Sequence, residues 1–294
     1  DAFFNRMREA GIDVRAFIPV HFPAFTSKVN YRNHRKICVI DGEIGYIGGM
    51  NIAKRYVKGN NGMAWRDTHL RVMGGAVYGL QRAFLMDWYF IVRSIINGHA
   101  YYPASKLTEP NDCIMQIVTD GPVSDWPEMM QGYVRILLEA KRYVYIETPY
   151  FLPTEPVMFA MRVAALAGVD VQLMIPLHSD ARFVEWASRS YVRESVDSGV
   201  KVFFYTAGFN HSKILVADDS LCTCGSTNVD FRSFENNFEI NAFIYDRRTA
   251  IRMKGIFHDD LNHCIPYEEY MRHRRLSFPQ RLWESLVRLF SPLM

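Results

Sequence analysis

The chain has 294 residues, of which 49% are apolar and 14% aromatic, enough to bury the core of one large domain or two of moderate size. This composition excludes a disordered or low-complexity chain, and a formal net charge of only +3 gives no support for a nucleic-acid partner. Five cysteines without a C-x-x-C pair exclude a disulfide framework and favour a reducing compartment.

The apolar patterns of the sequence predict both strands and helices. The predicted helix at 77–96 contains charged side chains, so we expect one buried apolar face, including Phe84, rather than a membrane span. In chain order the predicted elements are a helix end and strand at 8–14, a strand, turn and strand at 37–47, the helix at 77–96, a helix at 127–140, a strand at 143–146, a helix at 155–167, a strand at 169–175, a second helix end and strand at 196–202, a second strand, turn and strand at 214–224, and an amphipathic helix at 282–293.

Two copies of one pattern of polar residues stand far apart in the chain. In each copy a lysine follows a histidine by two positions, an aspartate follows by seven and an asparagine by seventeen. Duplicated folds normally preserve apolar patterns, whereas these copies share side chains that carry chemistry, which indicates a duplicated active site. The two sets are His34, Lys36, Asp41 and Asn51, and His211, Lys213, Asp218 and Asn228.

The sequences before the two copies also match, at 8–14 and 196–202. A strand, helix, strand and helix precede this point in the second half, but the first half has only ten residues there. If the halves are duplicates, about 75 residues of the first half are absent from its amino end. We therefore predict a first half at 1–108, truncated at its amino end, and a second half at 109–294 that ends in the amphipathic helix.

Paired histidines and lysines suit the chemistry of a phosphodiester. One imidazole can attack phosphorus while the other protonates the leaving alkoxide. The two lysines and the two asparagines can hold the charge that develops on phosphorus, so we expect no metal and no cofactor. Ser226 in the second copy, where the first copy has Gly49, is a further predicted phosphate donor.

A catalytic imidazole usually needs a carboxylate that fixes its tautomer. In the second half the candidate is Glu239, 28 positions after the histidine, and in the first half Asp67 or His69 occupies the comparable region. Asp41 and Asp218 either do this work or cap the turn between the two strands. The residues alone leave both interpretations open.

The pattern H-x-K-x4-D-x6-G-[GS]-x-N, present twice, resembles the phospholipase D superfamily. The segments 31–36, 48–51, 65–69, 148–153 and 291–294 are similar to those of bacterial cardiolipin synthases. The resemblance covers nearly the whole chain. It implies a duplicated α/β phospholipase D fold with pseudo-two-fold symmetry, in which each half is a mixed β-sheet flanked by helices.

This resemblance also implies an activity. Two phosphatidylglycerol molecules would react through a covalent phosphohistidine and give cardiolipin and free glycerol, with His34 as nucleophile and His211 as general acid. The enzyme would act at the bacterial cytoplasmic membrane, anchored by amino-terminal helices, with its catalytic part outside the bilayer core. A hydrolytic phospholipase D, another phosphatidyltransferase and a nuclease are the alternatives, and the sequence says nothing of the oligomeric state.

The amphipathic helix at the end of the chain predicts either an anionic membrane surface as partner or packing on the protein's own core. The leucines of its apolar side follow i, i+4, i+7, i+11 spacing. The apolar side consists of Leu282, Leu286, Leu289 and Leu293 with Trp283, Val287 and Phe290, the polar side of Arg281, Glu284, Ser285 and Arg288, and the basic lead-in of Arg272, His273, Arg274 and Arg275.

Overall fold

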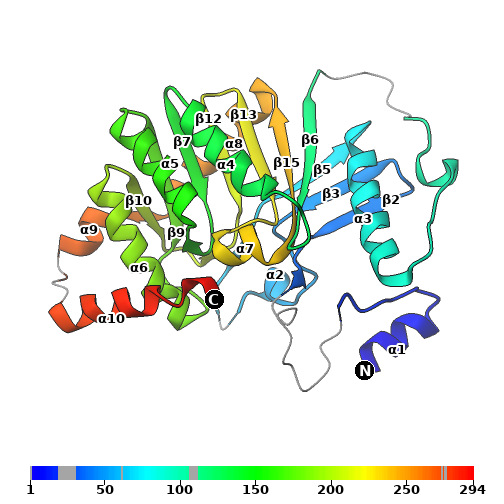
Figure 1. Ribbon diagram of the computed structural model, residues 1–294, viewed down its shortest axis with the longest axis horizontal. Coiled ribbons are helices and arrows are strands. Elements are labelled where there is room, and N and C mark those ends of the chain that lie inside the picture. The colour runs from blue at the N-terminus through cyan, green and yellow to red at the C-terminus, as the bar shows by residue number, and fades with distance from the viewer. Residues whose placement is uncertain (1, 19–30, 61, 106–111, 273, 275–276) are drawn as a thin grey trace.

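The computed structural model describes residues 2–18, 31–60, 62–105, 112–272, 274 and 277–294 (Figure 1). Its helices are α1 (Ala2–Glu9), α2 (Arg55–Lys58), α3 (Ala76–Val92), α4 (Glu128–Glu139), α5 (Glu155–Leu166), α6 (Arg182–Asp197), α7 (Phe231–Glu235), α8 (Arg247–Leu261), α9 (Tyr267–Arg272) and α10 (Phe278–Arg288). Its strands are β1 (Arg32–Asn33), β2 (Ile37–Ile40), β3 (Ile44–Gly48), β4 (Trp65–Arg66), β5 (His69–Met73), β6 (Ile114–Asp120), β7 (Tyr143–Glu147), β8 (Phe151–Leu152), β9 (Asp170–Pro176), β10 (Lys201–Tyr205), β11 (Phe209–Asn210), β12 (Ile214–Ala217), β13 (Leu221–Gly225), β14 (Val229–Asp230), β15 (Asn237–Tyr245) and β16 (Cys264–Pro266).

A mixed sheet forms the centre of the molecule, with nine strands in the described part of the chain. The strand order is β1-β15-β13-β12-β7-β9-β10-β16, and β6 also pairs with β15. Side chains alternate across the sheet, so that Val144 and Ile146 of β7 face one core while Tyr143 and Tyr145 face the other. Helices α4, α5 and α6 cover the first face, and α8 covers part of the second.

The first half packs on the remaining part of that second face. Its antiparallel strands β2, β3 and β5 form a small sheet, and α3 lies on it (Figure 1). Ile47, Val77 and Leu80 share a core with residues of β13 and β15. The expected α/β fold with two sheets flanked by helices is therefore confirmed, and the boundary predicted at 108 and 109 lies outside the described residues.

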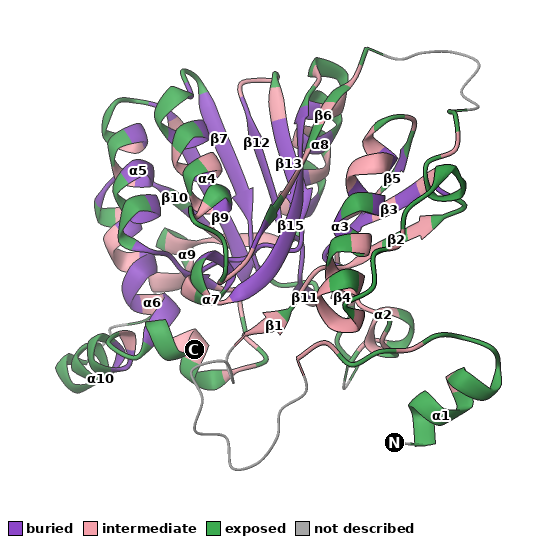
Figure 2. Cartoon of the chain, turned by 45° about the vertical axis from the view of Figure 1, so that its right-hand side comes forward, coloured by how far each residue is buried: buried purple, intermediate pink, exposed green. Residues whose placement is uncertain are grey.

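Two sequence expectations in the first half are wrong. The predicted strand near residues 12–14 is not formed, and α1 buries no side chain, because no strand of the described chain lies beside it (Figure 2). The predicted helix at 77–96 ends at Val92, and Phe84 is 44% exposed because only the amino-terminal part of α3 lies on the small sheet. Among the residues described, no helix is both long and apolar enough to cross a membrane.

Helix α10 packs on α6 through a narrow side and exposes most of its surface (Figure 2). Val287 and Glu284 are its buried residues, and Glu284 pairs with Arg193 of α6. The sequence interpretation placed Glu284 on the solvent side, which is wrong, because the arginine of α6 recruits it into the contact. The leucines remain outside, with Leu282 49% and Leu289 73% exposed.

Candidate active site

Both predicted catalytic histidines follow short strands that pair across the two halves. β1 of the first half runs parallel to the start of β15, and β11 of the second half runs parallel to β4. His34 and Glu239 are the residues directly after the paired positions of β1 and β15, and they lie beside each other. Asp67 and His211 follow the paired positions of β4 and β11 in the same way. Each histidine therefore meets the carboxylate of the opposite half, a crossing that the sequence interpretation left undetermined.

The two imidazole–carboxylate pairs have similar geometry. Nδ1 of His34 lies 2.9 and 3.1 Å from the two oxygens of Glu239, and Nδ1 of His211 lies 2.8 Å from Oδ2 of Asp67. Both carboxylates are buried, so each is a fixed acceptor that orients its ring. Nε2 of each ring is left for a substrate. The alternative candidate His69 joins neither pair, since its buried Nδ1 has no partner among the described residues.

The two lysines repeat the same hydrogen bond. Nζ of Lys36 donates to the carbonyl of His34 at 2.5 Å, and Nζ of Lys213 donates to the carbonyl of His211 at 2.6 Å. Lys213 is also 3.0 Å from Nδ1 of His211. The pseudo-two-fold relation thus extends to individual hydrogen bonds, because each lysine donates to the carbonyl of the histidine two positions before it.

The two asparagines differ in their surroundings. Asn228 is buried, and its amide nitrogen donates to Asp230 at 3.0 Å, while its Oδ1 has no partner in the described ranges. Asn51 is half-buried and lines an open hollow together with Lys36. Of the two, Asn51 is the amide that faces open space beside a site lysine.

Ser226 and Gly49 occupy matching positions but serve the carboxylates rather than a phosphate. The hydroxyl of Ser226 donates to the buried Glu239, which corrects the expectation that it donates to phosphate, because a buried carboxylate needs donors of its own. At Gly49 an added Cβ would lie 2.2 Å from Oδ1 of Asp67. The glycine is therefore required by the close approach of that carboxylate.

Tyr56 is a site residue that the sequence interpretation missed. Its hydroxyl lies 3.0 Å from Oδ2 of Asp67 and 3.1 Å from Nδ1 of His211. It provides a hydroxyl contact to Asp67, as Ser226 does for Glu239. Tyr56 follows the motif asparagine by five positions, where the second copy has another hydroxyl residue, and this spacing could have revealed it.

Asp41 and Asp218 lie at the far ends of β2 and β12, away from the histidines that precede these strands. Asp218 accepts hydrogen bonds from the backbone N–H groups of residues 141–143 at 2.7–2.9 Å, and these lower the pKa of its carboxyl group although burial opposes them. Both aspartates have positive φ, +53° and +54°, as turn residues. The expectation of a catalytic role is corrected to one in the turns, because a four-residue strand separates each aspartate from the site.

Burial lowers the pKa values of the cationic groups in this site. Burial and the neighbouring Lys213 lower the pKa of His211 to about 3. Burial likewise lowers the pKa of Lys36 to about 8 and that of Lys213 to about 7, although Glu239 and Asp67 raise both. Burial thus outweighs the two carboxylates, and a bound phosphodiester would favour the charged form of these groups. The described ranges hold no group of three or more His, Cys, Asp or Glu side chains suited to a metal ion.

A buried polar network holds β4 against β11 beneath His211. Arg66 donates to the hydroxyls of Thr68 and Ser212 at 2.9 and 3.0 Å, and Asn210 donates to Glu147 at 3.1 Å. Burial and the nearby carboxylate of Asp260 raise the pKa of Glu147 to about 8. This network fixes the strand pairing that brings Asp67 to His211.

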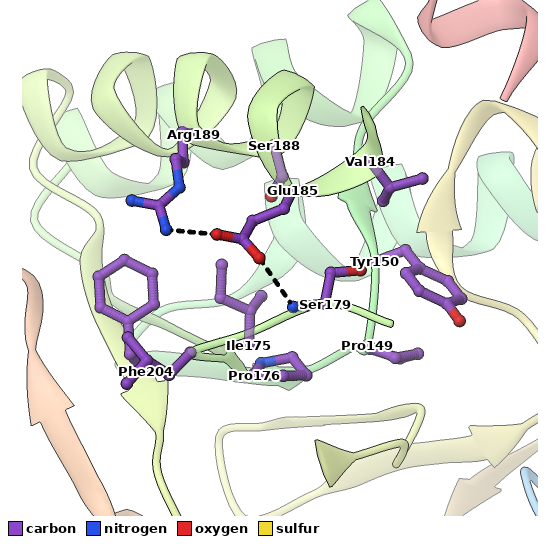
Figure 3. A pocket seen from close by; sticks show the side chains of 11 residues that line it. Pro149, Tyr150, Ile175, Pro176, Ser179, Val184, Glu185, Ser188, Arg189 and Phe204 are labelled. Atoms are coloured by element: carbon purple, nitrogen blue, oxygen red, sulfur yellow. Dashed lines mark hydrogen bonds and ion pairs between the residues drawn. The ribbon is translucent and has the colours of Figure 1, made fainter. Parts of the chain in front are cut away.

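A pocket adjoins the site on the side of the second half (Figure 3). Tyr150 connects the two, because it lines this pocket and its ring centre is 6.5 Å from that of His211. The charged side chains in the pocket, Glu185 and Arg189, form an ion pair with each other (Figure 3). Its remaining lining is mostly apolar, comprising Pro149, Ile175, Pro176, Leu177, Val184 and Phe204.

Several known proteins are similar to this chain in sequence or in fold. The model of the family described as "Cardiolipin synthase, PLD-like domain" matches residues 133–261. Cardiolipin synthase 2 of Bacillus cereus is 40% identical over 100% of this chain and 57% of its own length. The major cardiolipin synthase of Bacillus subtilis is 40% identical over 99% of this chain and 61% of its own length. The chain thus spans about three fifths of the length of these curated relatives.

The crystal structure of phosphatidylserine synthase from Haemophilus influenzae matches 91% of this chain and 72% of its own, with a TM-score of 0.71 at 14% sequence identity. At this identity the likeness concerns the fold alone. The family match, the sequence identity over the whole chain and the shared fold agree with one another. Residues 133–261 therefore match the family described as "Cardiolipin synthase, PLD-like domain", and the chain as a whole is similar in sequence to curated cardiolipin synthases.

Proposed function

We propose that this chain is the catalytic part of a cardiolipin synthase that transfers a phosphatidyl group from one phosphatidylglycerol to another. The observation that carries the proposal is the crossed arrangement of two imidazoles, each held by a buried carboxylate and accompanied by a lysine. Such a site can divide phosphoryl transfer into two steps through a covalent intermediate. The identity of 40% to curated cardiolipin synthases supports this choice of lipid chemistry.

In the first proposed step, Nε2 of His34 attacks the phosphorus of one phosphatidylglycerol. The bond from phosphorus to the head-group glycerol oxygen breaks, and His211 gives its Nε2 proton to that oxygen. Burial and Lys213 lower the pKa of His211 to about 3, so its ring acquires this proton as the anionic substrate binds and favours the charged imidazole. Lys36, Lys213 and Asn51 stabilise the charge on the phosphoryl oxygens.

In the second proposed step, free glycerol has left and a second phosphatidylglycerol enters. Nε2 of His211 takes the proton from its hydroxyl, and the hydroxyl oxygen attacks phosphorus. The bond from phosphorus to His34 breaks, which gives cardiolipin and restores both histidines. Two displacements at phosphorus give net retention of configuration.

A lipid assay tests the function directly. The chain is incubated with vesicles of labelled phosphatidylglycerol, and the products are separated. We expect cardiolipin and an equal amount of glycerol. Phosphatidic acid in place of cardiolipin would identify a hydrolytic phospholipase D, and cleavage of single-stranded DNA without any lipid product would identify a nuclease.

The fall of kcat/KM at alkaline pH should follow the loss of positive charge from Lys36 and Lys213. Lys213 and Lys36, with pKa values of about 7 and 8, lose their positive charge as the pH rises through these values. An anionic substrate then binds less well, so kcat/KM for a soluble phosphodiester should fall by about tenfold per unit between pH 7 and 8, and by up to about a hundredfold per unit above pH 8, where both lysines are neutral. In Lys36→Arg, whose guanidinium stays charged, the decline still begins near pH 7 but should stay at about tenfold per unit above pH 8. A flat profile from pH 7 to 9 would contradict the proposed role.

We also propose that α10 lies on an anionic membrane surface, which would place the chain at the bacterial cytoplasmic membrane. The α10 apolar surface consists of the exposed residues Phe278, Leu282, Leu286, Leu289, Phe290 and Leu293. Trp283 extends it towards α6, where its ring lies 5.9 Å from Trp186. The exposed Arg272, Arg274 and Arg281 supply positive charge beside it, while His273 and Arg275 lie outside the described residues. Exposed leucines next to arginines suit a layer of acidic head groups over acyl chains.

Two aspartates in place of two leucines should separate lipid binding from chemistry. Leu286→Asp with Leu289→Asp should weaken binding to phosphatidylglycerol vesicles by about 10- to 100-fold, because the inserted apolar area is lost. Hydrolysis of a soluble phosphodiester should remain within about twofold, since both leucines are exposed. Ser285→Asp, which adds charge at an exposed polar position of the same helix, is the control. Equal loss of binding and hydrolysis would instead indicate a role in folding.

A further inference from the structure

Arg55 is a half-buried arginine at the edge of the active site that no step above uses. Its guanidinium lies 4.7 Å from the ring centre of Trp65, whose own ring lies 5.7 Å from that of His211. Trp65 in turn packs on Phe209 with ring centres 4.4 Å apart. This aromatic support fixes the plane of the guanidinium and leaves its N–H edges available.

Arg55 lacks the carboxylate that the neighbouring arginines have. Arg35 pairs with Asp87, Arg66 with Asp260 at 2.6 Å, and Arg189 of the adjoining pocket with Glu185. Within the described part of the chain, Arg55 has no ion pair, and its buried Nε has no hydrogen-bond partner. A half-buried cation without a counterion is the feature expected of a receptor for an anion.

The charge of Arg55 acts on the reaction centre itself. It contributes to the lowered pKa of Lys36, after the larger effect of burial. It also acts on Tyr150, where burial and Asp180 raise the pKa of the hydroxyl and Arg55 opposes them. Arg55 therefore lies within electrostatic reach of both Lys36 and Tyr150.

The proposed reaction contains a second anion that needs such a partner. The acceptor phosphatidylglycerol carries its own phosphate, which is one glycerol unit away from the hydroxyl that attacks. When that hydroxyl meets the phosphohistidine, two phosphates lie close together and repel each other. Lys36 and Lys213 donate to the carbonyls of the two histidines and serve the first phosphate, and Arg189 is already neutralised by Glu185.

We propose that Arg55 binds the phosphate of the acceptor phospholipid and so selects an anionic lipid, rather than water or a neutral alcohol, as acceptor. The inference rests on the proposed function and deepens it. The guanidinium can donate two parallel N–H bonds to the phosphate oxygens, which a lysine cannot do. The apolar pocket beyond Tyr150 has no unpaired charge for this task.

A competition between two acceptors tests the role of Arg55. Labelled phosphatidylglycerol vesicles are supplied with butanol, and the ratio of cardiolipin to phosphatidylbutanol is measured. We expect Arg55→Gln to lower cardiolipin formation by about 10- to 100-fold and to leave phosphatidylbutanol within about threefold. Arg55→Lys should restore cardiolipin only in part. Lys58→Ala, which removes an exposed positive charge at the end of the same helix, should leave the ratio unchanged.

The product ratio does not depend on how much of a variant is folded, because the same phosphoenzyme gives both products. An unchanged ratio in Arg55→Gln would overturn the inference and leave the proposed function intact. An equal fall of both products would also overturn it, because Arg55 would then act on the donor or on the chemistry. Wild-type protein that forms phosphatidylbutanol but no cardiolipin would refute the proposed function, and the acceptor role of Arg55 with it.

Discussion

Replacing His34 by alanine should abolish the phosphoenzyme and lower phosphatidyl transfer by about 10⁴-fold or more, as expected when a covalent nucleophile is lost. Replacing His211 by alanine should lower transfer to natural phospholipid by about 10²- to 10⁴-fold, the usual contribution of a general acid and base. The activities of the two variants should differ when the leaving group of the substrate is changed. p-Nitrophenolate leaves without a proton, so a p-nitrophenyl phosphodiester does not need the acid.

With this activated substrate, His211→Ala should still release one equivalent of p-nitrophenol and then stop. The phosphoenzyme forms, but no base is present to activate the incoming hydroxyl. His34→Ala should show no such burst. Rapid mixing measures the burst, and mass spectrometry at alkaline pH, where phosphohistidine survives, locates the modified residue. A phosphate on His211 would reverse the two assignments.

The two imidazoles differ in burial. His211 is the more buried, and burial lowers its pKa to about 3, while His34 retains 26% exposure of its side chain. A neutral ring suits a nucleophile, whereas the order of the motifs in the superfamily points to His34. Only the labelled residue decides between the two arguments.

The repeat in the sequence predicts a set of candidate site residues. Spacing alone selects both histidines, both lysines and both asparagines, because the strand, turn and strand that carry them are local structures. The same spacing could not assign Asp41 and Asp218. A turn aspartate and a catalytic aspartate look alike in sequence, and only the length of β2 and β12 separates them from the histidines.

The crossing of the carboxylates could not be predicted from the sequence. It depends on β1 pairing with β15 and on β11 pairing with β4, contacts between residues more than 140 positions apart. Arg55 was missed for a related reason, because its contact with Trp65 exists only in the folded chain. Tyr56 of the same short helix α2 contacts Asp67 and His211, and its spacing from Asn51 was the one signal in the sequence.

Each histidine contacts the carboxylate of the opposite half, and this pairing leads to the second prediction with a large effect on activity. If each carboxylate serves the histidine of the opposite half, Asp67→Asn should impair the step in which His211 acts as base. The amide of asparagine can donate to Nδ1 of His211, which forces the ring proton onto Nε2 and removes the lone pair that the base needs. We expect transfer to fall by about 10³- to 10⁴-fold, with the phosphoenzyme accumulating.

Glu239→Gln should impair the first step, in which His34 forms the phosphoenzyme. Glu239 accepts hydrogen bonds from His34, Ser226 and Asn237, and a glutamine offers only one oxygen for these three groups. The ring of His34 then loses its fixed tautomer, so phosphoenzyme formation should slow by a similar factor and no intermediate should accumulate. Part of the effect will be on stability, which thermal unfolding of the same variant measures separately.

Asp41→Asn is the matched control, because it makes the same chemical change in a turn of the first half. It should retain phosphoenzyme formation and transfer within about threefold. Single-turnover kinetics with the p-nitrophenyl substrate resolves formation of the phosphoenzyme from its breakdown in all three variants. If Asp67→Asn blocked formation and Glu239→Gln blocked breakdown, then either the nucleophile would be His211 or each carboxylate would serve its own half. Mapping the phosphohistidine in wild-type protein separates these two explanations, since a label on His34 would leave only the second.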